Sequence, residues 1–394
     1  MPTGQLSSRE RVRLALAHRE TDRVPVALAY AGINEPARTM FEEYVRSRGH
    51  GSLDNYLDPL LDIAAVGPRY VGPRLEPGCD IWGVKRAPVP YGPASYDEIE
   101  RYPLASVENV DQLARHAWPS ADWFDYTVLP ERIAAAHVGG PRCIMVYNGN
   151  PFETSWYMRG FERMFSDLIT NPELARGILG RVTDFYVEYF HRLLSAAKGA
   201  VDLVGTADDI GGQNGLLMSL DMWAGFIKPQ HARLNAAIHE HGARVIYHSD
   251  GGVMEAVPGL IDMGIDVLQA LQFDAAGMDA AKLKAAYGGR LCFQGGVSVQ
   301  HTLPLGKPEQ VRAEVEQLIT TLGRHGGYIL GPSHCIQAGT PPENIYAMFE
   351  TARSFCPHGR AARNGGRTHR CPVRYPRATR DRRCSTRMAP RETR

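Results

Sequence analysis

The sequence predicts a (β/α)₈ barrel, and three observations support this fold class. Short apolar runs recur along the 394 residues, and most are followed by a segment with the 3.6-residue apolar period of a helix. Eight such units fit into roughly 350 residues, which suits a barrel with insertions. Polar side chains gather directly after the apolar runs, where the carboxyl ends of barrel strands meet. An open doubly wound sheet is the alternative, because the first strands are the least regular.

The clearest of the eight expected strands runs into a group of polar residues. Apolar residues that follow Arg244 lead into His248, Ser249 and Asp250, and two glycines come next. An unbroken apolar run suits a strand buried on both faces, and the glycines let the backbone turn sharply. The eight strands are expected to begin near residues 24, 62, 143, 201, 244, 265, 291 and 327.

Two segments are expected to lie outside the regular barrel. Ser7 and Glu10 have the spacing of a capping box, which predicts a helical extension before the first strand. Residues 68–125 predict an insertion, in which Gly78–Lys85 has strand alternation and the following stretch is rich in Pro, Gly and Tyr. A substrate-covering role and a plain surface insertion are both compatible with this composition.

The composition is that of a soluble globular protein, with 44% hydrophobic and 22% charged residues. No segment approaches 18 consecutive apolar residues, so no membrane span is expected, and the first residues lack the apolar core of a signal peptide. The cysteines of the body, at positions 79, 143, 292 and 335, are scattered singly. This pattern favours a reduced, cytoplasmic setting.

The net charge differs in sign between residues 1–355 and residues 356–394. The whole chain has 44 basic and 43 acidic residues, and residues 356–394 contain 12 Arg and 2 acids, which leaves 32 basic and 41 acidic residues before them. The acidic barrel, residues 1–355, argues against a nucleic-acid-binding core. The Arg-rich tail lacks periodicity and has almost no aliphatic residues. It predicts a disordered arm, a nucleic-acid- or anion-binding arm, or a sequence read out of frame.

Polar residues follow six of the expected strands, and they define the candidate site. Two histidines with a carboxylate can form an open zinc site, and we expect the metal ligands His248, Asp250 and His334. The alternative is that these groups cap loops and bind backbone amides, and Cys335 is expected to be a small buried filler. The remaining candidates are Glu153, Asp208 and Asp209 for catalysis and Gln213, Arg159, Tyr247, Gln269 and Gln294 for substrate binding.

Several motifs together resemble the uroporphyrinogen decarboxylase superfamily, which holds decarboxylases and cobalamin-linked methyltransferases. The resemblance covers most of residues 8–353 and implies a (β/α)₈ barrel. It is carried by Arg9-Glu-Arg-Val before Arg23-Val-Pro-Val, Phe152 to Gly160, Asp208 to Gln213, His248 to Gly251, Gly327 to His334 and Thr340 to Asn344.

The departures from the superfamily's motifs decide between its branches. The haem-pathway decarboxylases carry paired arginines in an early motif, and the matching segment Ala29–Glu35 contains no arginine. The methyltransferase branch holds zinc through His-x-Cys and a later Cys, and here these positions read His248-x-Asp250 and His334. The resemblance thus implies a zinc site with oxygen and nitrogen ligands.

The leading hypothesis is a zinc-dependent methyltransferase of O-demethylase type, which passes a methyl group to or from a corrinoid on a separate protein. Glu153 is the expected fourth ligand or proton shuttle, and Asp208 with Gln213 would orient the substrate. One alternative is a metal-independent decarboxylase, in which Asp208 stabilises a protonated intermediate and Arg159 holds a carboxylate. Another is a binding barrel without catalysis.

Overall fold

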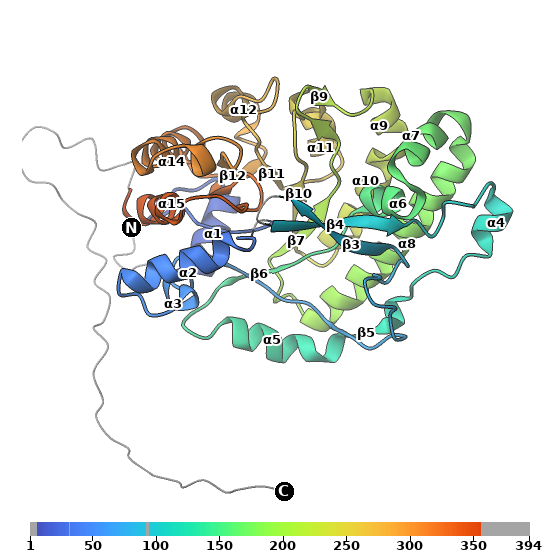
Figure 1. Cartoon of the computed structure of the whole chain (residues 1–394), viewed down its shortest axis with the longest axis horizontal. Helices are drawn as coiled ribbons and strands as arrows, with labels where there is room; N and C mark the ends of the chain where they lie inside the picture. Colours follow the sequence, from blue (N-terminus) through green and yellow to red (C-terminus); the bar gives the residue numbers. More distant parts are fainter. Residues whose placement is uncertain (1–5, 31, 92–93, 356–394) are drawn as a thin grey trace, which may run out of the picture. The chain divides into compact units, whose positions relative to one another are not determined.

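The computed structural model describes residues 6–30, 32–91 and 94–355. The Arg-rich segment 356–394 lies outside the described residues, and its predictions stay predictions. Seven strands form one parallel sheet in the order β1-β6-β7-β10-β11-β12-β13 (Figure 1). Their bounds are Ile63–Ala65, Cys143–Val146, Leu203–Ala207, Arg244–His248, Val267–Ala270, Cys292–Val297 and Tyr328–Pro332.

The segment after Arg23, where the first strand is expected, completes the barrel beside the seven strands of the sheet. Val26 pairs in parallel with Leu330 of β13, and Ala27 N donates to Leu330 O over 2.9 Å. On the other side, Asp62 N, which directly precedes β1, donates to Val26 O over 2.9 Å. This segment therefore bonds to both edges of the curled sheet and closes it, which confirms the predicted barrel class.

Helices surround the sheet, as the right-handed β-α-β connection of a parallel sheet requires. α8, the longest, spans Pro172–Ala197 and begins with Asn171 as its N-cap and a proline at its first position. None of the described helices is long and apolar enough to cross a bilayer. Further helices are α2 (Ala37–Ser47), α3 (Leu53–Leu57), α5 (Leu129–Ala136), α6 (Pro151–Arg159), α7 (Phe161–Thr170), α9 (Leu220–Phe226), α10 (Lys228–His239), α11 (Val257–Asp262), α12 (Ala280–Tyr287), α13 (Thr302–Leu305), α14 (Pro308–Leu322) and α15 (Pro342–Ser354).

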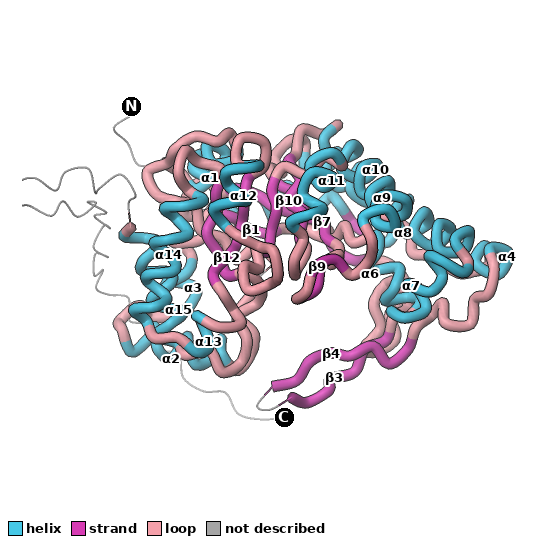
Figure 2. The backbone as a smooth tube through the Cα atoms, turned by 90° about the horizontal axis from the view of Figure 1, so that it is seen from above, coloured by secondary structure: helices cyan, strands magenta, loops and turns pink. Residues whose placement is uncertain are grey.

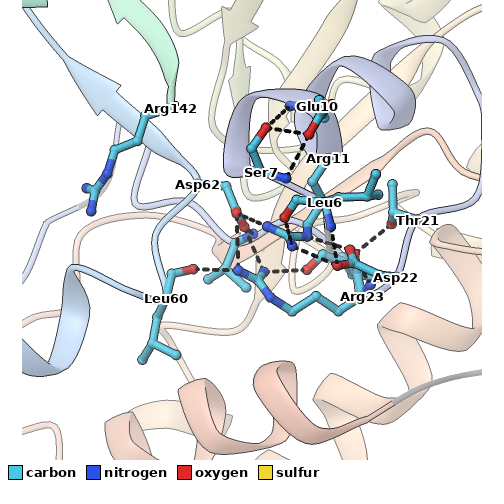
Figure 3. A network of polar contacts seen from close by, with 12 residues as sticks. Leu6, Ser7, Glu10, Arg11, Thr21, Asp22, Arg23, Leu60, Asp62 and Arg142 are labelled. Carbon is cyan, nitrogen blue, oxygen red and sulfur yellow. Dashed lines mark hydrogen bonds and ion pairs between the residues drawn. The ribbon is translucent and has the colours of Figure 1, made fainter. Parts of the chain in front are cut away.

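Helix α1, Ser8–Leu16, covers the amino-terminal end of the barrel, and Ser7 and Glu10 form the predicted capping box. Val12 of this helix joins the apolar cluster that fills the barrel interior. An ionic network ties α1 to the first strands (Figure 3). In it, Asp62 accepts hydrogen bonds from Arg11 Nη1 over 2.6 Å, Arg23 Nη1 over 2.7 Å and Val26 N over 2.8 Å.

The insertion contains an antiparallel hairpin of β3, Lys85–Tyr91, and β4, Ala94–Arg101. Figure 1 shows the hairpin crossing in front of the sheet, and Figure 2 shows it standing apart from the barrel on one side. The strand alternation of Gly78–Lys85 predicts a strand too early, because β3 begins only at Lys85 and the residues before it form turns and irregular backbone, in which Trp82 and Val84 are buried. The insertion also contains β2 (Arg69–Tyr70), α4 (Val110–Ala114) and β5 (Phe124–Asp125).

Candidate functional site

Strand register places three polar side chains on one inward-facing level of the barrel. Ile246, Val267 and Cys292 belong to the interior apolar cluster. Because side chains alternate between faces, the residues two positions later also point inward. These residues pair in register, with His248 beside Gln269 and Gln269 beside Gln294. Apolar packing thus ends at this level, and a buried polar layer begins.

Gln269 fixes the orientation of His248. His248 Nδ1 is hydrogen-bonded to Gln269 Oε1, and an amide oxygen can only accept, so Nδ1 carries the proton. In the neutral imidazole the lone pair is then on Nε2, which lies 3.6 Å from Asp209 Oδ1 and 4.0 Å from Asp250 Oδ1. A hydrogen bond of this kind is typical of the outer shell of a metal-binding histidine. Gln269, expected to bind substrate, instead positions His248.

The three expected metal ligands come together at the mouth of the barrel. One ligand atom each from His248, Asp250 and His334 lies within 4.8 Å of the others, and His334 Nε2 is 3.6 Å from Asp250 Oδ2. Asp250 follows the fifth strand and is held by a hydrogen bond from its own N to Asp209 Oδ1 over 2.8 Å. Two imidazole nitrogens and one carboxylate oxygen are a common set of protein ligands for zinc.

The surroundings of Asp250 agree with this interpretation. Its Oδ1 is buried and has no hydrogen-bond partner among the described residues. A buried carboxylate oxygen without a partner is costly unless a ligand completes it. Burial raises the pKa of the Asp250 carboxyl, and His248 and His334 oppose this shift. These residues therefore fit a divalent metal ion better than loop caps.

The neighbouring glycine is required by close backbone packing. Gly251 has φ +80°, and a Cβ at this position would lie 2.4 Å from the carbonyl carbon of Gly211. Its N–H donates to Gln272 Oε1 over 2.9 Å. Gly211 belongs to the short hairpin of β8, Gly211–Gly212, and β9, Gly215–Leu216. This packing fixes the loop that carries Asp250.

Glu153 is a buried acid next to the cluster, in the first turn of α6. Its Oε2 accepts from Asn150 Nδ2 over 2.7 Å, and its Oε1 accepts from Tyr157 Oη over 3.1 Å. Burial, followed by the charges of Asp209 and Asp208, raises the pKa of Glu153 to about 8. The side chain is thus protonated at neutral pH, and a protonated carboxyl group can act as a general acid.

Asp208 lies beneath the site rather than in it. It is fully buried and accepts hydrogen bonds from the backbone N–H groups of Phe152 and Glu153, at 2.9 and 2.7 Å, and contacts His231 Nε2 at 2.6 Å. A carboxylate at the start of α6 is favoured by the helix dipole. With these partners Asp208 positions Glu153. The side chain of the next residue, Asp209, is 36% exposed and faces the cluster, where its Oδ1 lies 3.6 Å from His248 Nε2.

Three residues expected to bind substrate have other surroundings in the structure. Arg159 is 2% exposed and binds Asp167 at 2.7 Å together with backbone carbonyls of the insertion. Tyr247 points outward, because its neighbour His248 points inward, and it donates to Asp208 O over 3.0 Å. Gln213 is exposed on the β8–β9 turn. These positions correct the expected substrate contacts of Arg159 and Tyr247.

Sequence reasoning missed Tyr30, which lies inside the mouth. Its ring stacks on His248 with centroids 5.1 Å apart and meets the Tyr147 ring edge-on at 5.0 Å. Its hydroxyl is buried and has no partner among the described residues. A Cβ on Gly205 would lie 2.5 Å from this hydroxyl, so the glycine makes room for the ring. A tyrosine after an apolar run gives no sequence signal that separates this role from packing.

Comparison with known proteins assigns the family. A family model described as uroporphyrinogen decarboxylase (URO-D) matches residues 87–355. The chain belongs to the uroporphyrinogen decarboxylase family. A uroporphyrinogen decarboxylase of Azoarcus sp. (strain BH72) is 24% identical over 309 residues, which are 75% of this chain and 74% of the relative.

Members of this family include a second kind of enzyme. A methylated-thiol–coenzyme M methyltransferase of Methanosarcina mazei is 29% identical over 203 residues, 52% of this chain and 51% of that protein. The solved structure of a methyltransferase from Methanosarcina mazei superposes with a TM-score of 0.62 at 20% identity, covering 89% of this chain and 99% of that chain. This structural likeness confirms the fold, and the family includes both decarboxylases and a methyltransferase.

Proposed function

We propose that this protein is a zinc-dependent methyltransferase that removes a methyl group from an oxygen of a small substrate and passes it to a corrinoid on a separate protein. The observation that carries the proposal is the cluster of His248, Asp250 and His334, in which the contact of Nδ1 with Gln269 leaves Nε2 of His248 available to a metal. One relative is a methyltransferase for methylated thiols, and this supports methyl transfer as the class of reaction.

In this proposal His248, Asp250 and His334 hold zinc, and Asp209 and Gln269 keep two of these ligands in place. A bound zinc ion would supply a Lewis acid that polarises the methylated oxygen of the substrate. Gln294 lies on the same level as His248 and has no hydrogen-bond partner among the described residues for either amide atom. It is therefore available to orient a polar group of the substrate.

Glu153 supplies the proton that the reaction needs. When the methyl group leaves, the bond between the methyl carbon and the oxygen breaks and its electron pair stays on the oxygen. The protonated Glu153 donates to that oxygen, and Tyr157 and Asn150 hold its carboxyl group in position. A carboxyl group with a pKa near the working pH is well suited to this role. In the reverse direction the same group accepts the proton.

The metal-independent decarboxylase is less well supported by the geometry. It needs Arg159 to hold a substrate carboxylate and Asp208 to stabilise a cationic intermediate. Both side chains are buried and bound to protein partners. A binding barrel without catalysis does not account for a buried acid with a raised pKa beside a cluster of metal ligands.

The test is methyl transfer from a panel of methyl ethers to chemically reduced cobalamin, with zinc-loaded protein and with the corrinoid spectrum as readout. Replacing Glu153 by Gln should lower the rate about 100-fold or more, because general acid catalysis typically contributes that much. Glu162→Gln, an exposed position on the next helix, is the control. Equal rates in both variants, or release of carbon dioxide without any change in the corrinoid, would contradict the proposal.

A further inference from the structure

A cavity of about 740 Å³ lies between the β3–β4 hairpin and the loop that follows the first strand. The cavity adjoins the candidate site, because its lining residue Arg86 stacks on the ring of Tyr157, and Tyr157 Oη donates a hydrogen bond to Glu153. It is lined by Asn34, Glu35, Pro36, Arg86, Ala94, Ser95, Tyr96 and Asp97.

Arg86, at the start of β3, is the one cation among these lining residues, and the protein holds it in a defined place. Its Nη1 donates to Asp80 Oδ2 over 2.9 Å, and Asp80 is fixed in turn by the N–H groups of Trp82 and Val84. Its guanidinium carbon lies 4.9 Å from the centroid of the Tyr157 ring. These contacts place Arg86 one side chain away from Glu153, the proposed acid.

The contacts of Arg86 leave part of its guanidinium for a ligand. Among the described residues, no hydrogen bond involves its Nε or Nη2. Guanidinium groups bind carboxylates through two parallel hydrogen bonds, and this geometry is specific for planar anions.

The two acids that line the cavity do not compete directly for this edge. Glu35 is occupied at the start of α2, where its Oε2 accepts from the N–H and the hydroxyl of Thr39 at 3.1 and 2.7 Å. Asp97 is exposed on β4 opposite Pro88, and no ion pair joins it to Arg86 among the described residues.

The cavity is an open groove with the volume that small-molecule sites usually have, roughly 300–1,000 Å³. Methanol or methylamine would occupy only a small part of it. A substrate that fills it has a body much larger than the methyl group that reacts.

We propose that the substrate is a methylated organic acid, whose carboxylate is bound by Arg86 under the hairpin while its methyl ether reaches the cluster. The methyl ether rests on the proposed function, whereas the carboxylate rests on Arg86 and the cavity. The hairpin is then the element that determines which methylated compound is accepted.

Three probes of nearly equal shape test this assignment by calorimetric titration without corrinoid: 4-methoxybenzoate, the neutral 4-methoxybenzamide and the cationic 4-methoxybenzylammonium. Since binding alone is measured, the result does not depend on whether methyl transfer occurs. The benzoate should bind wild-type protein about tenfold or more tightly than the amide, because a paired carboxylate contributes a charge-assisted hydrogen bond. Arg86→Gln should remove this preference, and Arg86→Lys should restore part of it.

Arg101→Gln is the matched control, because Arg101 is an exposed arginine on the same hairpin that pairs with Glu76. It should keep the full preference for the benzoate. Near-ultraviolet circular dichroism of each variant checks that the hairpin remains folded. Equal binding of benzoate and amide, tighter binding of the cation, equal effects of the two glutamine substitutions, or no binding of any probe would each overturn the proposal.

Discussion

At the amino-terminal end of the barrel, the buried Asp62 has hydrogen-bond partners on both carboxylate oxygens, from Arg11, Arg23 and the backbone of Val26 (Figure 3). At the carboxyl-terminal end, Gln294 is equally buried, and neither amide atom has a partner among the described residues. Buried polar groups normally find partners, so exceptions require an explanation. The contrast indicates that the first end serves stability and the second is arranged for a ligand.

Breaking the ionic network should have the largest effect on stability. Asp62→Ala removes the shared partner of Arg11 and Arg23 and leaves their charges in a buried place. We expect the free energy of unfolding to fall by about 3–5 kcal/mol, as is usual when one partner of a buried ion pair is lost. Denaturant unfolding measures this change. Metal affinity, measured on the variant under folding conditions, should stay the same. A loss of both stability and metal affinity would contradict the claim that the two ends of the barrel have separate roles.

A substitution at the other end should show the opposite pattern. Gln269→Leu removes the acceptor of the His248 Nδ1 proton without removing any proposed ligand. We expect zinc affinity to fall about 10- to 100-fold, the usual effect of losing such a supporting hydrogen bond. Competition with a chromogenic chelator gives the affinity. An unchanged affinity would mean that Gln269 does not orient His248 for a metal.

The raised pKa of Glu153 predicts a pH-dependent contribution to stability. The folded state holds this proton up to a pH of about 8, whereas the unfolded chain releases it near 4.5. Protonated Glu153 therefore stabilises the fold fully below pH 4.5, and this contribution declines from there until the pH passes about 8. Unfolding experiments between pH 5 and 9 should show Glu153→Gln becoming more stable relative to wild type as pH rises. Parallel profiles would exclude a raised pKa.

The smallest expected effect comes from the unpartnered amide itself. Gln294→Leu keeps the approximate volume and removes polar atoms that lack partners. Stability should stay within about 1 kcal/mol of wild type or rise, because no hydrogen bond is lost, whereas methyl transfer should slow. Thermal unfolding and the corrinoid assay measure the two effects. A clear loss of stability would show that Gln294 has a structural partner.

The sequence predicted the barrel because each strand is a buried apolar run, and most helices carry their own apolar period. It also located the proposed ligands, since polar residues that follow parallel strands must gather at one end. The first strand was harder to place, because only Val26 has a regular bridge to β13. The prolines of β3 obscured the hairpin, although an exposed two-stranded ribbon tolerates them.

The roles of individual polar residues depended on contacts that lie far apart in the chain. Arg159 donates to carbonyl groups of the insertion about 50 residues earlier in the chain, and no local sequence pattern predicts these hydrogen bonds. Asp208 meets His231 from α10, which the sequence did not single out. Tyr247 could have been assigned correctly, because a strand cannot turn both Tyr247 and His248 inward.

The central claim is that the carboxyl-terminal end of the barrel holds a metal, and elemental analysis of purified protein tests it most directly. His248→Ala removes a proposed ligand. His239→Ala is the control, because His239 is an exposed histidine of α10 that pairs with Asp266. We predict about one zinc per chain in wild type and in His239→Ala, and almost none in His248→Ala. Wild-type protein that takes up no zinc, or a His248→Ala variant that retains it, would contradict the account.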